Sequence, residues 1–414
     1  MNENILKTIH QNCLKIQEWF TEKEKGLTLP FYLSIDLRDA DFKASFVDTN
    51  LFPAGFNNLC QNNLKNTGSA LKNAIIRKNP AAKEILLITE EHTRNLWYLQ
   101  NIYSLEQLFK GSGFKVTLGM FHDFGAPSSS LTTAKDNKII IYGSEWLENN
   151  INSFDLIILN NDLTNGIPEI LNETTTPVFP SPKLGWHQRS KSKHFELANK
   201  LITEFSRLLE LDPWLFSSFY TKASNININS KNDRQVLYEH AKELFSKLSV
   251  KYNEYDIKQK PYIFLKADSG TYGIGVQAIE NPKEILSLNS RARNNLSKGK
   301  GGKKTDNYIL QEGIPSKIRF QGNPAEVCLY SIENQTIGGF FRYNDIKSSR
   351  ENLNSRGMGF STICFEPLHS KECPGSKAFT PSKDNNLPSE LEIMFYKILN
   401  RIAIIAAAQE DKII

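Results

Sequence analysis

Four stretches of the chain carry apolar residues at helical spacing. Residues 3–24, 195–219, 234–252 and 391–408 are each expected to form an amphipathic helix, because apolar positions three or four residues apart gather on one helix face. Ser389 precedes the last of these and is expected to cap it. The apolar face of that helix could pack internally or against a second copy of the chain. We expect internal packing and leave a homo-oligomer open.

Between residues 84 and 160, short apolar runs alternate with a helical segment, as in a small doubly wound α/β unit. The expected elements are strands at 84–88, 114–118, 138–142 and 155–159, and a helix at 93–110 capped by Thr93. Residues 160–163 follow the last strand and therefore lie at a strand's carboxyl end, where open α/β sheets bind ligands. An ordinary polar turn explains this loop equally well.

Residues 32–59 follow neither pattern, because charged residues and asparagines alternate irregularly with four phenylalanines. We expect a segment outside the core. Apolar walls with a few oriented polar groups are typical of a site for a small polar ligand. Arg38 could hold a carboxylate through two hydrogen bonds. A surface loop in which Arg38 pairs with Asp36 or Asp39 is at least as good an interpretation.

Residues 261–276 combine an apolar strand, expected at 262–265, with a glycine-rich segment. Lys266 ends the strand. The residues that follow it are small, glycine or hydroxyl-bearing: Ser269, Gly270, Thr271, Tyr272, Gly273 and Gly275. Backbone N–H groups of such a segment can approach phosphate oxygens, and a lysine supplies a compact positive charge. The segment matches neither a P-loop nor a dinucleotide fingerprint, and a hairpin turn that needs glycine is the alternative.

Three further strands are expected after this segment. The first, at 308–312, ends in Gln311 and Glu312, and the other two, at 325–332 and 337–344, read as a hairpin. Glu326 lies near the start of the hairpin and Arg342 near its end. A polar stretch then brings Glu351, Asn352 and Asn354 close together. Their oxygens suit Mg²⁺ held jointly with phosphate, and a loop capped by asparagine side chains is the alternative.

Two polar segments separate these parts of the chain. Residues 185–195 gather a tryptophan, two histidines, an arginine and two lysines, which could meet phosphate or carboxylate but more commonly form a solvated face. Residues 222–233 are rich in asparagine and serine and read as a linker or exposed loop. The predicted division is an N-terminal α/β substrate domain, a helical linker region and a nucleotide-binding domain, over residues 1–195, 196–255 and 256–414.

Composition adds little to this picture. The chain has 414 residues, 40% hydrophobic and 23% charged, with a net charge of +5 and scattered basic residues, so nothing argues for a nucleic-acid partner. No apolar run reaches the length of a membrane span, and the N-terminus lacks the features of a signal peptide. Five scattered cysteines without a C-x-x-C pair fit reduced thiols. We expect a cytoplasmic protein with small-molecule substrates and no membrane partner.

The order strand–lysine, glycine-rich loop, helix and strand–Gln–Glu over residues 261–360 resembles the ATP-grasp superfamily. A narrower resemblance, to the proteobacterial glutamate–cysteine ligase family first recognised in an acidophilic iron oxidiser, rests on segments throughout the chain: 34–58, 159–168, 185–195, 265–276, 310–316, 338–344 and 351–354. The block 34–58 is the most distinctive of them.

This resemblance implies an α/β fold in which a Rossmann-like pre-ATP-grasp domain precedes a helical segment and an ATP-grasp domain. It implies ATP and Mg²⁺ as cofactors and the first step of glutathione biosynthesis. ATP would phosphorylate the γ-carboxylate of glutamate, and the amine of cysteine would attack the acyl phosphate to give γ-glutamylcysteine.

The resemblance also implies residue roles. Lys266 and the segment from Ser269 to Gly275 would hold the phosphates, with Gln311 and Glu312 at the adenine and ribose. Arg342, with Lys266, would be catalytic and stabilise the acyl phosphate or the developing oxyanion. The metal candidates are Glu326, Glu351, Asn352 and Asn354, and the candidates for the substrate carboxylates are Arg38, Asn50 and Arg189.

One departure concerns the metal residues. ATP-grasp ligases usually carry a Glu-x-Asn pair behind an acid on a late strand, whereas Glu351 and Asn354 are one residue further apart and no acid-bearing strand follows. Two other functions are consistent with the pattern. One is a different carboxylate–amine ligase of the superfamily, such as a glutathione-synthetase-like enzyme. The other is a non-catalytic nucleotide-binding protein, which would predict that the phosphate and metal positions are missing.

Overall fold

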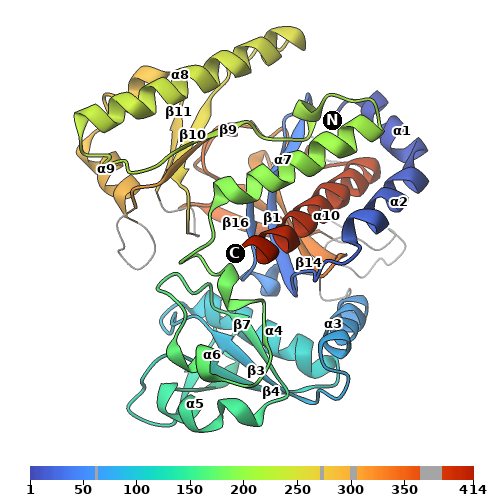
Figure 1. The fold of residues 1–414 in the computed structure, drawn as a ribbon, viewed down its shortest axis with the longest axis vertical. Helices are drawn as coiled ribbons and strands as arrows, with labels where there is room; N and C mark the ends of the chain where they lie inside the picture. The colour runs from blue at the N-terminus through green and yellow to red at the C-terminus, as the bar shows by residue number, and fades with distance from the viewer. Residues whose placement is uncertain (61–63, 271–274, 299–304, 364–384) are drawn as a thin grey trace.

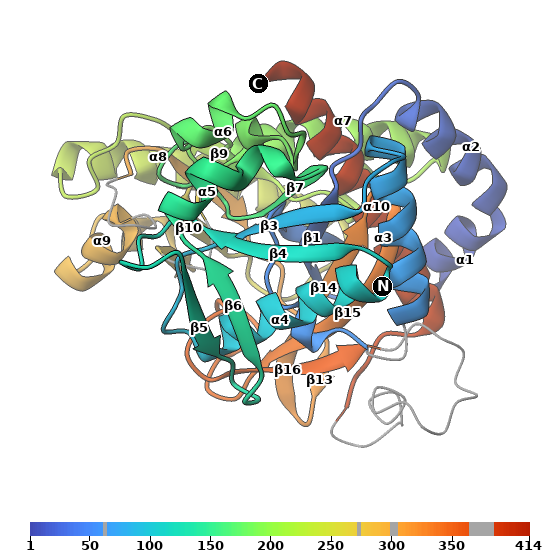
Figure 2. The same ribbon diagram turned by 90° about the horizontal axis from the view of Figure 1, so that it is seen from below.

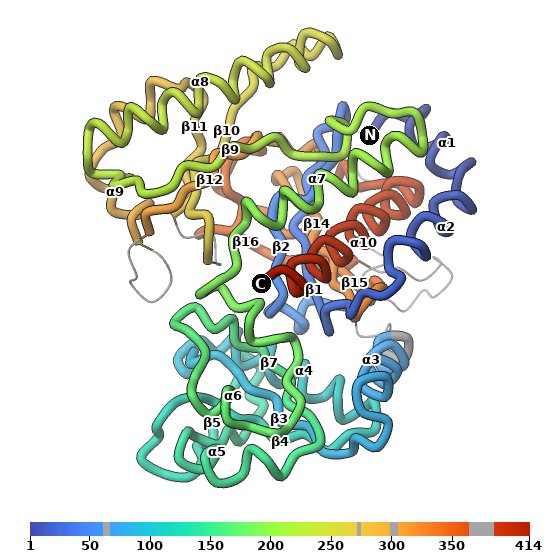
Figure 3. Tube along the Cα trace, in the orientation of Figure 1, coloured from blue at the N-terminus to red at the C-terminus, as the bar shows by residue number. Residues whose placement is uncertain are grey.

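Three β-sheets organise the computed structural model, which describes residues 1–60, 64–270, 275–298, 305–363 and 385–414. Together with the helices they form the predicted mixed α/β architecture (Figures 1 and 3). A mostly parallel sheet lies in the lower lobe of Figure 1, and two antiparallel sheets lie in the upper half.

The parallel sheet confirms the predicted doubly wound unit. Its strand order is β5-β6-β4-β3-β7-β8, and only β5 runs antiparallel to its neighbour. The strands are β3 (Glu84–Thr89), β4 (Lys115–Met120), β5 (Ser128–Thr132), β6 (Lys138–Tyr142), β7 (Leu156–Asn160) and β8 (Val178–Phe179). The chain builds outwards from β3 in one direction and from β7 in the other, so their carboxyl ends form a topological switch point (Figure 2).

The helices of this lobe are α3 (Leu64–Lys78), α4 (Leu96–Gly111), α5 (Ser144–Asn150) and α6 (Glu169–Glu173). The predicted cap Thr93 is wrong. Asn95 caps α4 instead, because its side chain accepts a hydrogen bond from the backbone N–H of Tyr98. The helix consequently begins at Leu96.

The small antiparallel sheet has the strand order β11-β10-β12-β9. Its strands are β9 (Tyr220–Ala223), β10 (Ile263–Ala267), β11 (Val276–Ile279) and β12 (Tyr308–Glu312). Helices α8 (Lys231–Glu254) and α9 (Ser290–Ser297) pack on it (Figure 1). The expected linker at 222–233 is partly wrong, because it includes the end of β9 and the capped start of α8.

The large antiparallel sheet has the order β16-β15-β14-β1-β2, with the short β13 paired to β14. Its strands are β1 (Tyr32–Asp39), β2 (Ala44–Asn50), β13 (Arg319–Phe320), β14 (Asn323–Ile332), β15 (Gln335–Asn344) and β16 (Met358–Ile363). The expectation that residues 32–59 lie outside the core is therefore wrong. Its buried charges Arg38, Asp39 and Lys43 each have an oppositely charged partner, as Lys43 does in the carboxylate of Glu312 at 2.9 Å.

The same sheet joins distant parts of the chain. β1 and β2 come from the predicted N-terminal domain, whereas β13 to β16 come from the predicted nucleotide-binding domain. Residues on both sides of the predicted boundaries at 195 and 255 thus share one sheet.

Helix α10 (Glu390–Ile413) is the core of the upper half of the molecule. It lies beside α7 (Lys191–Leu208) and against the large sheet (Figures 1 and 3), and its residues 402–407 are almost all inaccessible to solvent. Internal packing is thus confirmed, as is the cap by Ser389, which forms a reciprocal capping box with Glu392. In the described part of the chain, no helix combines the length and apolar character needed to cross a membrane.

Two other helix predictions need correction. The segment 3–24 forms two helices, α1 (Glu3–Gln11) and α2 (Cys13–Glu24), because Asn12 leaves the helical conformation between them. The helix expected at 195–219 begins earlier, after the cap Ser190, and ends at Leu208.

A buried ion cluster fixes α10 to the rest of the chain. Glu410 on α10 accepts a hydrogen bond from Arg189 Nε at 2.7 Å and contacts Nδ1 of His194 on α7. Arg189 also donates to the carbonyl of Thr49 in β2 at 2.9 Å. Burial alone would raise the pKa of Glu410, but Arg189 and His194 lower it to about 2. The cluster therefore ties α10, α7 and β2 together through one carboxylate.

We predict that Glu410→Gln destabilises the fold and changes its acid sensitivity. The folded-state pKa of Glu410 lies below its ordinary value of 4.5, so its stabilisation is complete above that value and is lost as the pH falls towards 2. The variant should show a lower urea midpoint near neutral pH and a flatter pH dependence of unfolding between about pH 4.5 and 2. The exposed Glu3→Gln is the control, and parallel pH profiles for Glu410→Gln and the wild type would contradict the prediction.

Candidate active site

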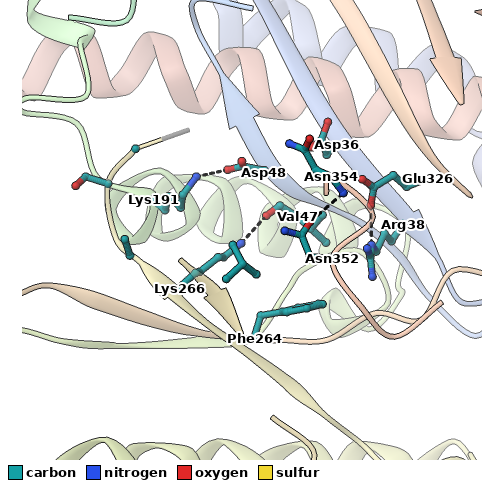
Figure 4. A pocket seen from close by; sticks show the side chains of 14 residues that line it. Asp36, Arg38, Val47, Asp48, Lys191, Phe264, Lys266, Glu326, Asn352 and Asn354 are labelled. Carbon is teal, nitrogen blue, oxygen red and sulfur yellow. Dashed lines mark hydrogen bonds and ion pairs between the residues drawn. The ribbon is translucent and has the colours of Figure 1, made fainter. Parts of the chain in front are cut away.

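A cavity opens between the two antiparallel sheets, with about 630 Å³ of empty space that is partly open to solvent (Figure 4). We call it the charged cavity. Most of its lining is charged or polar, and its residues are Asp36, Arg38, Val47, Asp48, Lys191, Phe264, Lys266, Ala267, Ser269, Gly270, Val276, Glu326, Asn352 and Asn354.

Lys266 provides the cation on the small-sheet side of the charged cavity. It shares a face of β10 with Phe264, because alternate residues of a strand point the same way. Its ammonium donates to the carbonyl of Val47 at 3.0 Å and has no ion pair among the described residues. Burial lowers the pKa of Lys266 to about 8, although Asp48 counteracts the shift. An anion placed here would be the partner that this ammonium lacks.

The opposite wall carries a chain of alternating charges. Arg342 Nη1 donates hydrogen bonds to the carboxylates of Asp36 and Glu326, each at 2.7 Å. Glu326 also accepts a hydrogen bond from Arg38 Nε at 2.8 Å. Burial alone would raise the pKa of Glu326, but Arg38 and Arg342 together hold it below its ordinary value. The wall therefore presents fixed charges of both signs.

Strand register produces this chain of charges. β1 pairs with β14 so that Asp36 lies opposite Cys328, and β14 pairs with β15 so that Glu326 lies opposite Arg342. Arg38 follows Asp36 by two residues and so points to the same face. The thiol of Cys328 donates to Asp36 at 3.3 Å.

The start of α7 forms a third wall. Lys191 forms an ion pair with Asp48 of β2. Asp268, just after β10, accepts the backbone N–H groups of Lys191 and Ser192 at 2.6 and 2.7 Å and the hydroxyl of Ser192 at 2.6 Å. The basic segment 185–195 is thereby fixed to the residues that follow Lys266.

Seven predicted site residues line the charged cavity: Arg38, Lys266, Ser269, Gly270, Glu326, Asn352 and Asn354. Arg342 lies behind this lining and contacts it through Asp36 and Glu326. Gly275 lines a neighbouring recess, and Thr271, Tyr272 and Gly273 lie outside the described residues.

Other predicted residues have their polar groups engaged elsewhere. Glu312 accepts hydrogen bonds from Lys43, Trp214 Nε1 and the backbone N–H of Phe219, so its carboxylate fixes the junction between the two antiparallel sheets. The side chain of Arg189 forms an ion pair with Glu410. Arg189 and Glu410 are both buried.

Asn50 and Glu351 also lie outside the lining of the charged cavity. Asn50 accepts the backbone N–H of Phe52 at 3.0 Å and shapes the turn after β2. Glu351 pairs with Lys347 and faces the recess that Gly275 lines. Both contacts are local, because Asn50 bonds a residue two positions on and Glu351 pairs with a residue four positions before it.

The sequence interpretation did not include Asp36, Asp48 and Lys191 among the site residues. Recognising β1 as a strand would have identified Asp36, because residues two apart on a strand point to the same face and Asp36 is therefore on the same side as Arg38. Lys191 belonged to the basic segment 185–195, but its position in the charged cavity depends on Asp268, which no local pattern specifies.

Several groups fit a nucleotide. Gln311 is buried, and neither its amide oxygen nor its amide nitrogen has a hydrogen-bond partner in the described structure, as expected where a ligand completes the site. Gly270 has φ +97°, and no atom that the structure describes outside its chain neighbours lies within 4 Å of the position a Cβ would occupy. Lys266 supplies the charge.

Fewer residues could coordinate a metal ion than could contact a nucleotide. Among the described residues, no group of three or more acidic, histidine or cysteine side chains could hold a metal ion. The charged cavity nevertheless offers carboxylate oxygens of Asp36 and Glu326 and amide oxygens of Asn352 and Asn354. Mg²⁺ commonly takes one or two carboxylates and completes its shell with water and substrate phosphates, so this donor set fits Mg²⁺ held jointly with a polyphosphate.

Comparison with known proteins adds independent information. A family model described as glutamate–cysteine ligase matches residues 6–411. A crystal structure from Methylobacillus flagellatus KT, named as a candidate gamma-glutamylcysteine synthetase, is 30% identical, with a TM-score of 0.86 over 99% of this chain and 96% of that one. No curated protein matches the sequence.

Two more distant structures are also similar. They are D-alanyl-alanine synthetase A from Vibrio cholerae O1 biovar eltor str. N16961 (12% identity, TM-score 0.34, covering 77% of this chain and 80% of that one) and a glutathione-synthetase-like effector from Globodera pallida (11%, 0.39, 86% and 83%). Their overlap is too low to support an argument.

We predict that Arg38→Met destabilises the protein by about 3 kcal/mol, because it removes a partner from the buried carboxylate of Glu326. Lys200→Met should change stability by less than about 0.5 kcal/mol, because its pair with Glu196 is exposed. Urea unfolding measures both. Equal shifts in the two midpoints would show that the charge chain contributes no more than a surface pair.

Proposed function

The chain belongs to the glutamate–cysteine ligase family, and we propose that the charged cavity is where it activates glutamate with ATP. The enzyme is a ligase that joins glutamate to cysteine. The observation that carries the proposed site is the convergence of Lys266, Lys191 and Arg38 with carboxylate and amide oxygens between two sheets. The scattered cysteines and the small-molecule chemistry are consistent with a cytoplasmic enzyme.

We assign the triphosphate to Lys266 and to the backbone at Ser269 and Gly270, with Thr271, Tyr272, Gly273 and Gly275 as further candidates. The buried amide of Gln311 supports a polar ligand near β12, consistent with an adenine contact. Glu312 acts through its neighbours, because Lys43, Trp214 and Phe219 already occupy its carboxylate. It would position β12 against the nucleotide rather than bind the ribose.

Asp36, Glu326, Asn352 and Asn354 are the proposed Mg²⁺ ligands, with phosphate oxygens completing the shell. The two carboxylates would share their oxygens between the metal and the arginines that bind them in this structure. Bound Mg²⁺ would neutralise phosphate charge. Glu351 is the weakest of the metal candidates from the sequence, because Lys347 holds it in a different recess.

The remaining residues orient the reactants. Phosphoryl transfer depends on positioning and on neutralising charge. Lys191 and Lys266 would flank the transferred phosphoryl group, and Arg342 would act through Asp36 and Glu326, which it holds in place. Arg38 would orient the glutamate γ-carboxylate towards the nucleotide only after exchanging one of its present contacts, whereas Arg189 would support the site through β2 and α7.

The test is phosphate release from ATP with Mg²⁺ and L-glutamate, with and without L-cysteine. We expect cysteine-dependent release with formation of γ-glutamylcysteine, and a fall of about 10²-fold or more in Lys266→Ala. Lys258→Ala, at an exposed lysine, should retain the rate. Release with γ-glutamylcysteine plus glycine instead would indicate the second step of glutathione synthesis, and ATP binding without turnover would favour a non-catalytic protein.

A further prediction concerns the protonation of Lys266. With a pKa of about 8 in the free protein, its side chain loses its charge as the pH rises above 8, whereas a bound polyphosphate favours the ammonium. ATP binding should therefore take up a proton near pH 8 and weaken above it. Calorimetry in buffers of different ionisation enthalpy measures the uptake. Lys266→Arg, which stays charged, should abolish it, and uptake that persists in this variant would assign the proton elsewhere.

A further inference from the structure

A second cavity meets the charged cavity at Ser269 and Gly270, which line both. We call it the switch-point cavity because Thr164, just after β7, also lines it. It contains about 1090 Å³ of empty space, partly open to solvent, and its lining includes Trp186, His187, Arg189, Lys222, Asp268 and Asp306. Open α/β sheets bind ligands at such a position.

His187 has a defined orientation in this cavity. Its Nδ1 lies 3.1 Å from the carbonyl oxygen of Leu163. A carbonyl can only accept, so Nδ1 carries the hydrogen and Nε2 carries a lone pair in the neutral ring. Within the described part of the chain, Nε2 has no hydrogen-bond partner. The half-buried ring thus presents an unengaged basic nitrogen.

The surrounding backbone is shaped for this ring. Leu163 has φ +50°, in the left-handed region that a leucine rarely adopts. A Cβ at Gly185 would lie 2.7 Å from His187 Nδ1 and 2.8 Å from the Cβ of Leu163, so only glycine leaves room for the ring. The N–H of Trp186 donates to the carbonyl of Asp162 at 2.9 Å. Both segments that hold His187 are therefore fixed to the carboxyl end of β7.

The other ionisable groups of the switch-point cavity are engaged. Arg189 binds Glu410, and Asp268 holds Ser192 and pairs with Lys222 at 3.4 Å. Asp306 accepts a hydrogen bond from Asn307. Among the described lining residues, His187 is the group best suited to accept a proton.

We propose that His187 is the general base that deprotonates the acceptor amine, with the switch-point cavity as the acceptor subsite. This inference rests on the proposed function. The acceptor enters as an ammonium, which has no lone pair and cannot attack the acyl phosphate formed in the adjoining charged cavity. An imidazole in the cavity that adjoins the charged cavity would remove that barrier.

The proton balance is as follows. Nε2 takes one proton from the ammonium, and the freed lone pair forms the bond to the acyl carbon. The C–O bond to phosphate breaks and its electron pair leaves with the phosphate. The nitrogen then loses a second proton to the departing phosphate, and the imidazolium returns its proton to solvent, so the amide forms without any further reactant.

The test compares His187→Asn with the wild type. The asparagine amide can still donate to the carbonyl of Leu163 but has no basic nitrogen. Two acceptors separate the roles: cysteine, which enters as an ammonium, and hydroxylamine, which is already neutral near neutral pH. We expect kcat with cysteine to fall by about 10²-fold, and hydroxylamine-dependent formation of the hydroxamate to remain within about threefold of wild type.

Three controls accompany this comparison. His10→Asn, at an exposed position of α1, should behave as wild type. Gly185→Ala keeps the imidazole but displaces it, and should also lose cysteine-dependent turnover selectively. Thermal unfolding of each variant checks that the fold is intact.

Two results would overturn the inference: an unchanged cysteine rate in His187→Asn, or parallel losses with cysteine and hydroxylamine, which would indicate a structural role. Failure of the wild type itself to turn over ATP with glutamate and either acceptor would instead refute the proposed function. The two failures are therefore distinguishable.

Discussion

The pairing of β1 with β14 is the constraint on which the charged cavity depends. It inserts a strand from the start of the chain beside a strand that begins at Asn323. Only this register places Asp36 and Arg38 among Glu326 and Arg342, where each charge has an oppositely charged neighbour. If β1 were displaced, the ion pair between Glu326 and Arg342 would remain, but Glu326 would lose Arg38 and Arg342 would lose Asp36. Burying an incompletely paired charge costs free energy. The fold and the site therefore depend on the same strand contact.

Two buried lysines show how the structure separates scaffold from site. Lys43 and Lys266 both come from segments near the junction of the antiparallel sheets, and burial lowers the pKa of each. Lys43 has the carboxylate of Glu312 at 2.9 Å, together with the face of Trp214, and so fixes one sheet to the other. Lys266 has only a backbone carbonyl as hydrogen-bond partner among the described residues. Asp48 acts on it only at a distance, and the lack of a direct ion pair among the described residues is consistent with a site for an anion.

The sequence predicted those features that local periodicity determines. The strand that carries Lys266, the doubly wound unit and the cap of α10 all follow from patterns within a few residues. β1 and β2 could not be found in this way, because buried charges such as Arg38 make a strand look like a polar loop. Their compensation comes from Glu326, 288 positions along the chain. The family resemblance implied the roles of Glu312 and Arg189, but it does not reveal the tertiary partners that engage both side chains.

Ser269 and Gly270 line both cavities. The proposed reaction can therefore place the phosphate in one cavity and the acceptor in the other. Phosphate is the leaving group of the second step, and it stays among the cations of the charged cavity, where Lys266 and Lys191 can stabilise its charge. In the proposed reaction the acceptor approaches from the switch-point cavity, where Nε2 of His187 has no hydrogen-bond partner among the described residues. A base placed directly between the two lysines would resist protonation, because neighbouring positive charge disfavours an imidazolium. The proposal places the base in one cavity and the cations that hold the phosphate in the other, which satisfies both electrostatic requirements.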